Sequence, residues 1–143
     1  MSGNLALSAS MQDYLEAIIE LEEEEGTVRI TDIANKLEIA KASVNQTIKK
    51  LKEMELVTQQ VYGPVELTDK GRQMAHKIRQ RHIKLRQFLI EVLGVDEDIA
   101  EKDACLMEHA VSAQTMNKLT DFLCRNGYMA AGCDLNDNEN IGD

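Results

Sequence analysis

The sequence has no tryptophan, only 3% aromatic residues and a single proline among its 143 residues. A core with so few rings must be built mostly from aliphatic side chains and methionine, and the near absence of proline favours helices. No apolar run approaches the roughly 20 residues of a membrane-spanning helix, and the N-terminal residues lack a signal-peptide pattern. We therefore expect a cytoplasmic, mainly helical protein with no membrane partner.

Cysteine is scarce as well, and the three residues are Cys105, Cys124 and Cys133. An odd number of widely spaced cysteines, without an export signal, predicts reduced thiols rather than a disulfide framework. This usage fits the reducing conditions of the cytoplasm.

Basic residues are outnumbered overall, since the net charge is −9, but they are concentrated in the middle of the chain. Residues 36–90 hold 12 Lys or Arg against 5 Asp or Glu, whereas the rest of the chain holds 4 against 20. A basic centre between acidic ends predicts that the middle of the chain meets phosphate groups. A solvated basic helix face would give the same pattern.

The first half of the chain has the pattern of a helix-turn-helix. Apolar spacing predicts three helices, over residues 8–25, 32–38 and 42–54. Ser8 or Ser10 is expected to cap the first, and Thr31, after a very short strand at Arg29-Ile30, the second. The tight turn over residues 39–41 makes the third helix a candidate recognition helix.

The outer face of this third helix is polar and can meet DNA. Asn and Gln can pair bidentately with adenine, Ser reads bases permissively, and Lys contacts phosphate. The candidate DNA-binding residues are Lys41, Ala42, Ser43, Asn45, Gln46, Lys49 and Lys50. Two alternating runs, 56–61 and 65–68, flank the turn Tyr62-Gly63-Pro64 and predict the β-hairpin wing of a winged helix.

The second half is expected to be a helical domain. A long helix begins after Thr68 and ends at Gly94, another follows Asp96, and a third runs from Ser112 to Asn126-Gly127. The last helix has an apolar stripe that suits a dimer surface, with Leu119, Phe122 and Leu123 as candidates. The expected domains are 1–70 for DNA binding, 71–127 for metal binding and dimerisation, and a flexible acidic tail over 128–143.

Cys105, Glu108 and His109 offer the three side-chain types that commonly bind transition metals. Their spacing of i, i+3 and i+4 would put them on one face of a helix. Three other interpretations are open: core packing of Cys105 beside a solvated corner, a cysteine–histidine enzyme, and oxidant sensing through Cys105. No oxyanion-hole loop or glycine-rich pocket accompanies the pair, so we do not expect an enzyme.

With these motifs in order, residues 8–127 resemble the diphtheria-toxin-repressor and manganese-transport-regulator family of metal-dependent repressors. The matching segments are Asp13-Tyr14-Leu15-Glu16, Ile33-Ala34 through Ser43–Thr47, Leu67–Gly71, Arg81-His82 and Cys105–His109. The resemblance implies a mainly α protein with an N-terminal winged helix-turn-helix and an α-helical dimerisation domain. It also implies a homodimer that represses transcription by binding a double-stranded DNA operator with a metal ion as corepressor.

The resemblance implies a metal-ligand set made of Asp13, Glu16, His82, Cys105, Glu108 and His109. The manganese branch has Glu at the position of Cys105, and the iron branch has Met at the position of Asp13, so this chain mixes the two sets. An ancillary iron-branch site would fall on Arg86, which cannot bind a cation, and on Glu101. A paired site using Glu16 with Glu101 or Glu108 stays open.

This mixed set favours particular metals. Carboxylates suit Mn²⁺ and Fe²⁺, and a thiolate shifts the preference toward softer ions. We expect Fe²⁺ first and Mn²⁺ close behind, with Zn²⁺, Co²⁺ or Ni²⁺ able to substitute.

Overall fold

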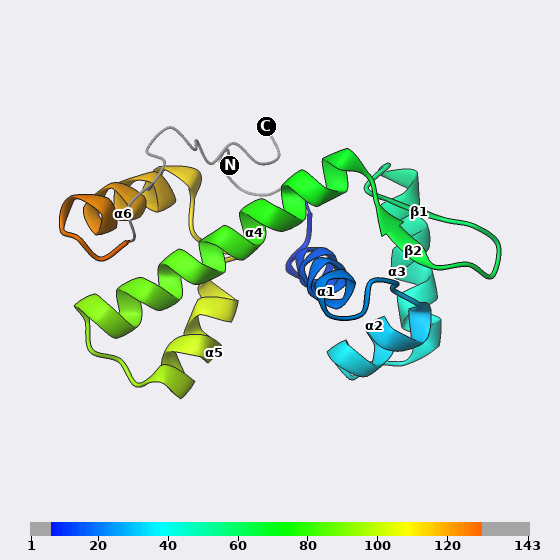
Figure 1. The fold of residues 1–143 in the computed structure, drawn as a ribbon, viewed down its shortest axis with the longest axis horizontal. Coiled ribbons are helices and arrows are strands. Elements are labelled where there is room, and N and C mark those ends of the chain that lie inside the picture. The colour runs from blue at the N-terminus through cyan, green and yellow to red at the C-terminus, as the bar shows by residue number, and fades with distance from the viewer. Residues whose placement is uncertain (1–6, 130–143) are drawn as a thin grey trace. The chain divides into compact units, whose positions relative to one another are not determined.

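The computed structural model describes residues 7–129, which are mainly helical with one two-stranded sheet (Figure 1). These residues form two compact units, one over Leu7–His76 and one from Lys77 onward. The division falls inside the helix α4 (Asp69–Gln87). The predicted mainly α fold with a small hairpin is confirmed.

The first unit begins with α1 (Ala9–Glu25), which starts where the sequence predicted. The Ser8 side chain accepts a hydrogen bond from the backbone N–H of Met11 at 3.2 Å and so satisfies one free donor of the first turn. Leu15 and Ile18 of α1 are fully buried, as are Ile33 and Leu51 of the next two helices. The core of this unit is aliphatic.

The helix-turn-helix consists of α2 (Ile30–Leu37) and α3 (Lys41–Glu53). The expected strand at Arg29-Ile30 and the expected cap at Thr31 are wrong. Arg29 is the N-cap, and its backbone N–H donates to the Asp32 carboxylate at 3.0 Å, so the helix starts earlier. The extended residue is instead Val28, whose carbonyl accepts from Val65 N–H at 2.7 Å.

The turn between α2 and α3 lacks glycine, and Glu38 takes the left-handed conformation there with a φ of 56°. The Glu38 N–H donates to Asn35 O, and the next N–H, of Ile39, donates to Ala34 O. These two bonds close the end of α2 and hold the turn without a glycine.

The predicted hairpin is confirmed, with β1 (Val57–Gln59) and β2 (Val65–Leu67) antiparallel and Val57 opposite Leu67. Its tip carries Tyr62 at a φ of 59°. This hairpin is the wing.

Thr68 connects the wing to α4. Its hydroxyl donates to Glu55 O at 2.7 Å and accepts from Gly71 N–H at 3.0 Å, which confirms Thr68 as the helix cap. Gly71 packs directly on the backbone of Leu56, because a Cβ at residue 71 would lie 1.9 Å from the Leu56 carbonyl oxygen. Only glycine allows α4 to start so close to β1.

The second unit holds the end of α4, a π-helix η1 (Phe88–Val92), α5 (Glu97–Met107) and α6 (Ala113–Arg125). The long helix expected to reach residue 93 therefore widens after Gln87 and ends at Val92, with Leu93 as its C-cap and Gly94 following at a φ of 73°. The expected cap of α6 is confirmed, since Ser112 accepts from Thr115 N–H at 3.2 Å. A shared core joins these helices through Leu85, Leu89, Ala100, Ala104 and Met116.

Cys124 forms a disulfide, whereas Cys105 does not. The prediction of reduced thiols is therefore wrong for Cys124, because number and spacing do not reveal which thiols the fold brings together. Of the tail expected over 128–143, Tyr128 is hydrogen-bonded to Leu123 and Gln87, and residues 130–143, with Cys133, lie outside the described residues. Among residues 7–129, no helix has both the length and the apolar character needed to cross a membrane.

Candidate metal centre and DNA-binding surface

His82, on α4, lies between two carboxylates of the same unit. Its Nε2 is 2.9 Å from Oε2 of Glu101, and its Nδ1 is 2.8 Å from Oε1 of Glu108. The helix α4 supplies the imidazole, and α5 with its C-cap supplies the two acids. Each ring nitrogen therefore faces a carboxylate oxygen with which it can share a proton or a metal ion.

Cys105 completes a three-residue cluster with His82 and Glu101. Its Sγ lies 3.8 Å from Nδ1 of His82 and 3.9 Å from Oε2 of Glu101, which stands one turn earlier on α5. One donor atom from each residue lies within 4.8 Å of the others. A thiolate, an imidazole and a carboxylate at these distances can bind one transition-metal ion.

Glu108 and His109 lie beyond the helix that carries Cys105, although Glu108 and Cys105 both face Nδ1 of His82. The helix α5 ends at Met107, Glu108 is its C-cap, and His109 lies in the turn that follows. The buried guanidinium of Arg81 explains this ending, because it donates to the carbonyl oxygens of Glu108 and Val111. The chain is held in a turn there instead of continuing the helix.

The buried carboxylate of Glu108 is suited to a metal ion. Its side chain is 1% exposed, and Oε2 has no hydrogen-bond partner among the described residues. Nε2 of His109 lies 3.5 Å from this oxygen. A buried carboxylate oxygen without a hydrogen bond is costly unless a proton or a cation satisfies it, so Glu108 and His109 offer a second pair of donors.

The two carboxylates also raise the pKa of His82 to about 9. The hydrogen bond that the imidazolium donates to Glu108 is the largest cause, partial burial lowers the pKa, and Glu101 raises it by a smaller amount. The imidazole is therefore protonated at neutral pH when no metal is bound. A metal ion must displace that proton, so metal affinity should rise with pH up to about 9.

Asp13 and Glu16 are carried by α1 of the other unit, where Asp13 is exposed and Glu16 is half-buried. They are three residues apart and share one side of that helix.

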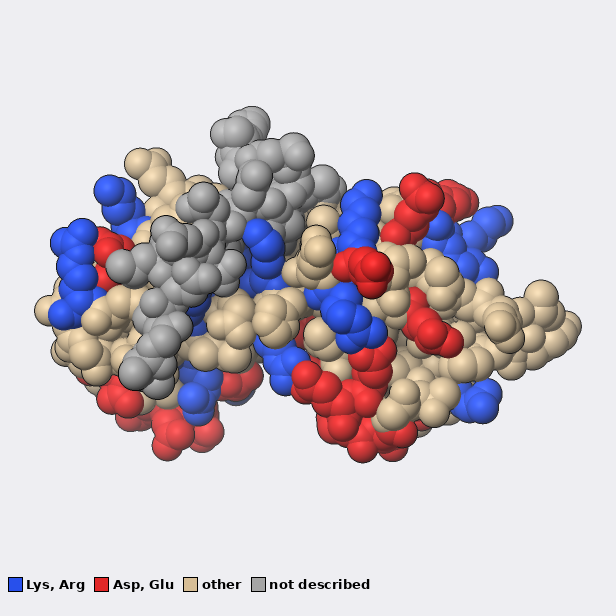
Figure 2. Space-filling model, turned by 45° about the horizontal axis from the view of Figure 1, so that its top comes forward, with Lys and Arg blue, Asp and Glu red and all other residues tan. Residues whose placement is uncertain are grey.

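Arg86 lies one turn after His82 on α4, and its Nε is 3.0 Å from Oε1 of Glu101. Asp and Glu side chains gather at the end of the second unit where α5 lies (the red atoms at lower left of Figure 2).

The expected DNA-binding residues of α3 are all exposed on one side of the helix. The buried side of the same helix holds Val44, Ile48 and Leu51. Exposed are Lys41, Ala42, Ser43, Asn45, Gln46, Lys49 and Lys50. The predicted DNA-binding face of α3 is therefore exposed in the structure.

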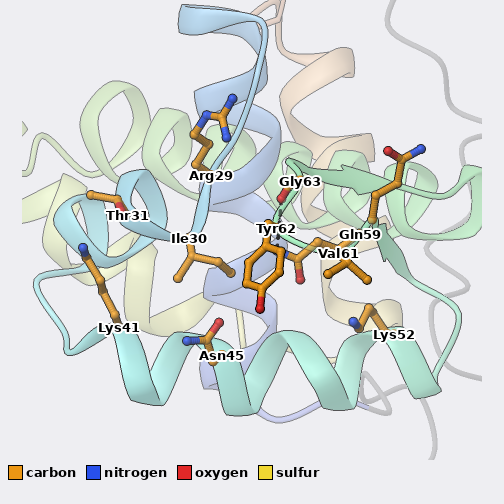
Figure 3. Close-up of a pocket in the computed structure, with 11 residues that line it drawn as sticks. Arg29, Ile30, Thr31, Lys41, Asn45, Lys52, Gln59, Val61, Tyr62 and Gly63 are labelled. Carbon is orange, nitrogen blue, oxygen red and sulfur yellow. Dashed lines mark hydrogen bonds between the residues drawn. The ribbon is translucent and has the colours of Figure 1, made fainter.

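A groove of about 540 Å³ lies between α3 and the wing, within the first unit. Its lining includes three cationic residues, Arg29, Lys41 and Lys52, and the wing residue Tyr62 (Figure 3). Tyr62 is 97% exposed at the tip of the hairpin. The combination of cations and an exposed aromatic ring suits a sugar-phosphate backbone.

Sequence reasoning missed several residues of these two sites. Arg29, Lys52 and Tyr62 lie outside the recognition helix pattern, and their shared groove depends on how the wing folds back. Arg81 was named in the sequence only as the neighbour of His82, without a structural role. Its contacts, however, are with backbone carbonyls that the sequence does not specify.

The candidate dimer residues on α6 differ in exposure. Phe122 is 41% exposed and stands between the rings of Phe88 and Tyr128, with centroid distances of 6.3 and 6.2 Å. Leu119 is partly buried against the core, and Leu123 is fully buried. Within one chain Leu123 is a core residue and has no surface to offer a partner, so that candidate is withdrawn.

Two family models match the chain in succession. The model of the iron-dependent repressor N-terminal DNA-binding domain matches residues 6–65. The model of the iron-dependent repressor metal-binding and dimerisation domain matches residues 68–126. The winged helix and the cluster around His82 fall one in each match.

Individual relatives agree. An HTH-type transcriptional regulator of Methanocaldococcus jannaschii is 36% identical over 118 residues, covering 82% of this chain and 94% of that protein. The regulator MntR of Bacillus subtilis is 35% identical over 114 residues, 80% of each chain. A manganese-dependent transcriptional repressor in complex with manganese has a TM-score of 0.73 at 32% identity, covering 83% of this chain and 53% of that chain. The present chain thus spans about half the length of that solved repressor.

Proposed function

Because the chain belongs to the iron-dependent repressor family of metal-dependent transcriptional regulators, we propose that Fe²⁺ or Mn²⁺ is the corepressor that switches it onto operator DNA. The observation that carries this proposal is the arrangement around His82, where two carboxylates and a thiol lie within 4 Å of one imidazole. The same chain has an exposed recognition helix. These two features support the proposal that one chain combines a metal-sensing group with a DNA-reading group.

We propose a ligand set in which His82, Cys105, Glu108 and His109 are joined by Asp13 and Glu16, with Glu101 as an additional oxygen donor. The geometry within the second unit supports the first four and Glu101. The family resemblance supports Asp13 and Glu16. Such a mixed set suits a six-coordinate ion, and a bound ion would supply the charge that neutralises these acids. Zn²⁺, Co²⁺ or Ni²⁺ should be able to substitute.

The proposed mechanism follows from ligands on two domains, taken as residues 1–70 and 71–127. Without metal, the carboxylates repel one another, and no single domain arrangement is favoured. Ligands drawn from both domains would bind an ion best in one arrangement, which shifts the population toward it. In a homodimer, two copies of α3 could then match half-sites about 34 Å apart or a multiple of that distance.

Each part of the DNA surface has a proposed role. Gln46 and Asn45 would read base edges, while Lys41, Lys49 and Lys50 would contact phosphates, with Ala42 and Ser43 at the base-facing start of α3. The DNA it binds would place the protein in the cytoplasm. We assign no catalytic step to Cys105, whose Sγ lies 3.8 Å from Nδ1 of His82, an imidazole held between two carboxylates.

A direct test measures binding to the promoter upstream of its own gene by fluorescence anisotropy. The full chain would be titrated with Mn²⁺, with Fe²⁺ under anaerobic conditions, with Zn²⁺ and with a chelator. We expect tight, sequence-dependent binding with metal and at least tenfold weaker binding with the chelator. The variant Glu108→Gln should lose this response, whereas His76→Gln, an exposed histidine earlier on α4, should keep it.

Equal binding with metal and with chelator would overturn the proposal. The comparisons support metal sensing and give no support to oxidant sensing through Cys105. That alternative makes an opposite prediction, because binding would then respond to peroxide while remaining indifferent to chelator.

A further inference from the structure

Arg86 is a fixed positive charge inside the candidate metal centre. Its Nε lies 3.0 Å from Oε1 of Glu101, and its terminal nitrogen lies 3.4 Å from Oε1 of Glu97. Arg86 follows His82 by four residues, so both side chains leave the same face of α4. The two acids that it contacts are also four residues apart, on α5.

The two oxygens of Glu101 therefore face different groups. Oε2 points to His82 Nε2 at 2.9 Å and lies 3.9 Å from Cys105 Sγ, while Oε1 is occupied by Arg86. One divalent ion can still be shared by Oε2, the thiol and the imidazole. A second ion bridged to the first through Glu101 would meet Arg86 at Oε1, because a carboxylate that bridges two ions commonly uses both of its oxygens.

The guanidinium cannot give way by losing its proton, since arginine stays charged at every physiological pH. It would repel a divalent ion approaching the same oxygen at contact distance. On the basis of these contacts, and of the proposed metal-dependent function, we propose that Arg86 replaces a second metal ion and limits the cluster of His82, Glu101 and Cys105 to one.

The acidity of α5 explains why such a limit matters. This helix carries Glu97, Asp98, Glu101 and Asp103 against one basic residue, Lys102. Carboxylates one turn apart attract hard cations, and Arg86 neutralises the pair that faces α4. Arg86 and both acids are more than one third exposed, so the pair contributes little to folding and its replacement should leave the fold intact.

The test compares the number of Mn²⁺ and Co²⁺ ions bound per protomer, measured by isothermal titration calorimetry and by metal analysis after equilibrium dialysis. The variants are Arg86→Glu, which adds an oxygen donor, and Arg86→Lys, which keeps the charge. Arg125→Glu is the matched control, because Arg125 also pairs with an acid in the same unit, Asp121, across one turn of α6. Circular dichroism verifies folding in each case.

We expect Arg86→Glu to bind one more ion per protomer than the unaltered chain, while Arg86→Lys and Arg125→Glu bind the same number as it does. Adding Glu101→Ala to Arg86→Glu should remove the extra ion. An unchanged number in a folded Arg86→Glu protein would overturn the inference, even if the unaltered chain binds metal. Should Arg86→Glu not fold, Arg86→Gln must raise Mn²⁺ affinity at least threefold, and an unchanged affinity would overturn the inference. Failure of the unaltered chain to bind any metal would instead refute the proposed function.

Discussion

Nδ1 of His82 lies 2.8 Å from Oε1 of Glu108, a buried carboxylate whose other oxygen has no hydrogen-bond partner among residues 7–129. The imidazolium and the carboxylate therefore stabilise each other only while His82 keeps its proton. The same two groups are proposed metal ligands, so proton and metal compete for one place. This competition makes pH a direct probe of the site.

Metal-free protein should lose stability as the pH rises from about 6.5 to about 9. His82 has a pKa of about 9 in the folded chain against 6.5 in the unfolded chain, so its contribution is complete below pH 6.5 and is lost above 9. We expect a loss of about 1–3 kcal/mol, measured by urea unfolding in chelator at a series of pH values. His82→Gln should flatten this dependence and His76→Gln should preserve it. A flat profile in the unaltered chain would contradict the assigned ion pair.

Cys105→Glu should change which metal is preferred. Replacing the thiolate by an oxygen donor should weaken Co²⁺, Zn²⁺ and Fe²⁺ binding more than Mn²⁺ binding, because only the softer ions gain from sulfur. Competition titrations would measure the ratios, and the Co²⁺ complex of the unaltered chain should show thiolate charge-transfer absorption. Leu106→Glu is the matched control, since it adds the same carboxylate at the next, exposed residue of α5. Equal loss for all ions would mean that Cys105 is not a ligand.

Gln46 and Lys49 should contribute to DNA binding in different ways. Gln46→Ala should cost about 1–3 kcal/mol and relax preference at one base position, since it removes a bidentate contact. Lys49→Ala should weaken binding to all sequences alike and reduce the salt slope by about one unit. Fluorescence anisotropy titrations of both variants would measure specificity on a set of operator mutants and the salt slope over a series of salt concentrations. Each variant serves as the control for the other. Intact specificity in Gln46→Ala would place the base-reading residues elsewhere on α3.

Phe122→Asp should convert a homodimer into monomers. The ring is 41% exposed and continues an aromatic row with Phe88 and Tyr128, so a charge there would be buried in the proposed interface. Sedimentation equilibrium would report the mass, and operator binding should weaken in parallel. Gln114→Asp adds the same charge at the exposed start of α6 and should leave the dimer unchanged. A dimeric Phe122→Asp protein would require a different interface.

Gly71→Ala should destabilise the winged helix by about 1–3 kcal/mol or more, because the added methyl group would overlap the Leu56 carbonyl oxygen at 1.9 Å. Urea unfolding measures the change, and Lys70→Ala at the adjacent exposed position should have little effect. Unaltered stability would show that α4 can shift away from the wing at no cost.

The sequence by itself predicted most of the local structure. Ser8, Thr68 and Ser112 mark helix starts because a hydroxyl before an apolar pattern can accept a free backbone N–H. The outer face of α3 could be predicted because helical periodicity alone separates Gln46 and Lys49 from the buried Val44 and Ile48. These inferences need only neighbours within a turn or two.

The tertiary structure decided how the candidate ligands group. Sequence spacing put Cys105, Glu108 and His109 on one helix, but α5 ends at Met107, and Arg81, more than 20 residues away along the chain, donates to the carbonyls of Glu108 and Val111 beyond it. Glu101 joined the site for a similar reason, since packing of α4 against α5 brings its carboxylate to His82.

The same distinction holds for charge and for the helix-turn-helix. The sequence determined that residue 86 is a cation, and only the fold decided that its partners are Glu97 and Glu101. It also determined that the turn before α3 has no glycine, and Glu38 takes the left-handed conformation there beside local bonds to Asn35 and Ala34. Local periodicity, capping and turn conformation depend on bonds between near neighbours, whereas ligand grouping and the ion pairs of Arg86 depend on contacts that form only when distant segments pack together.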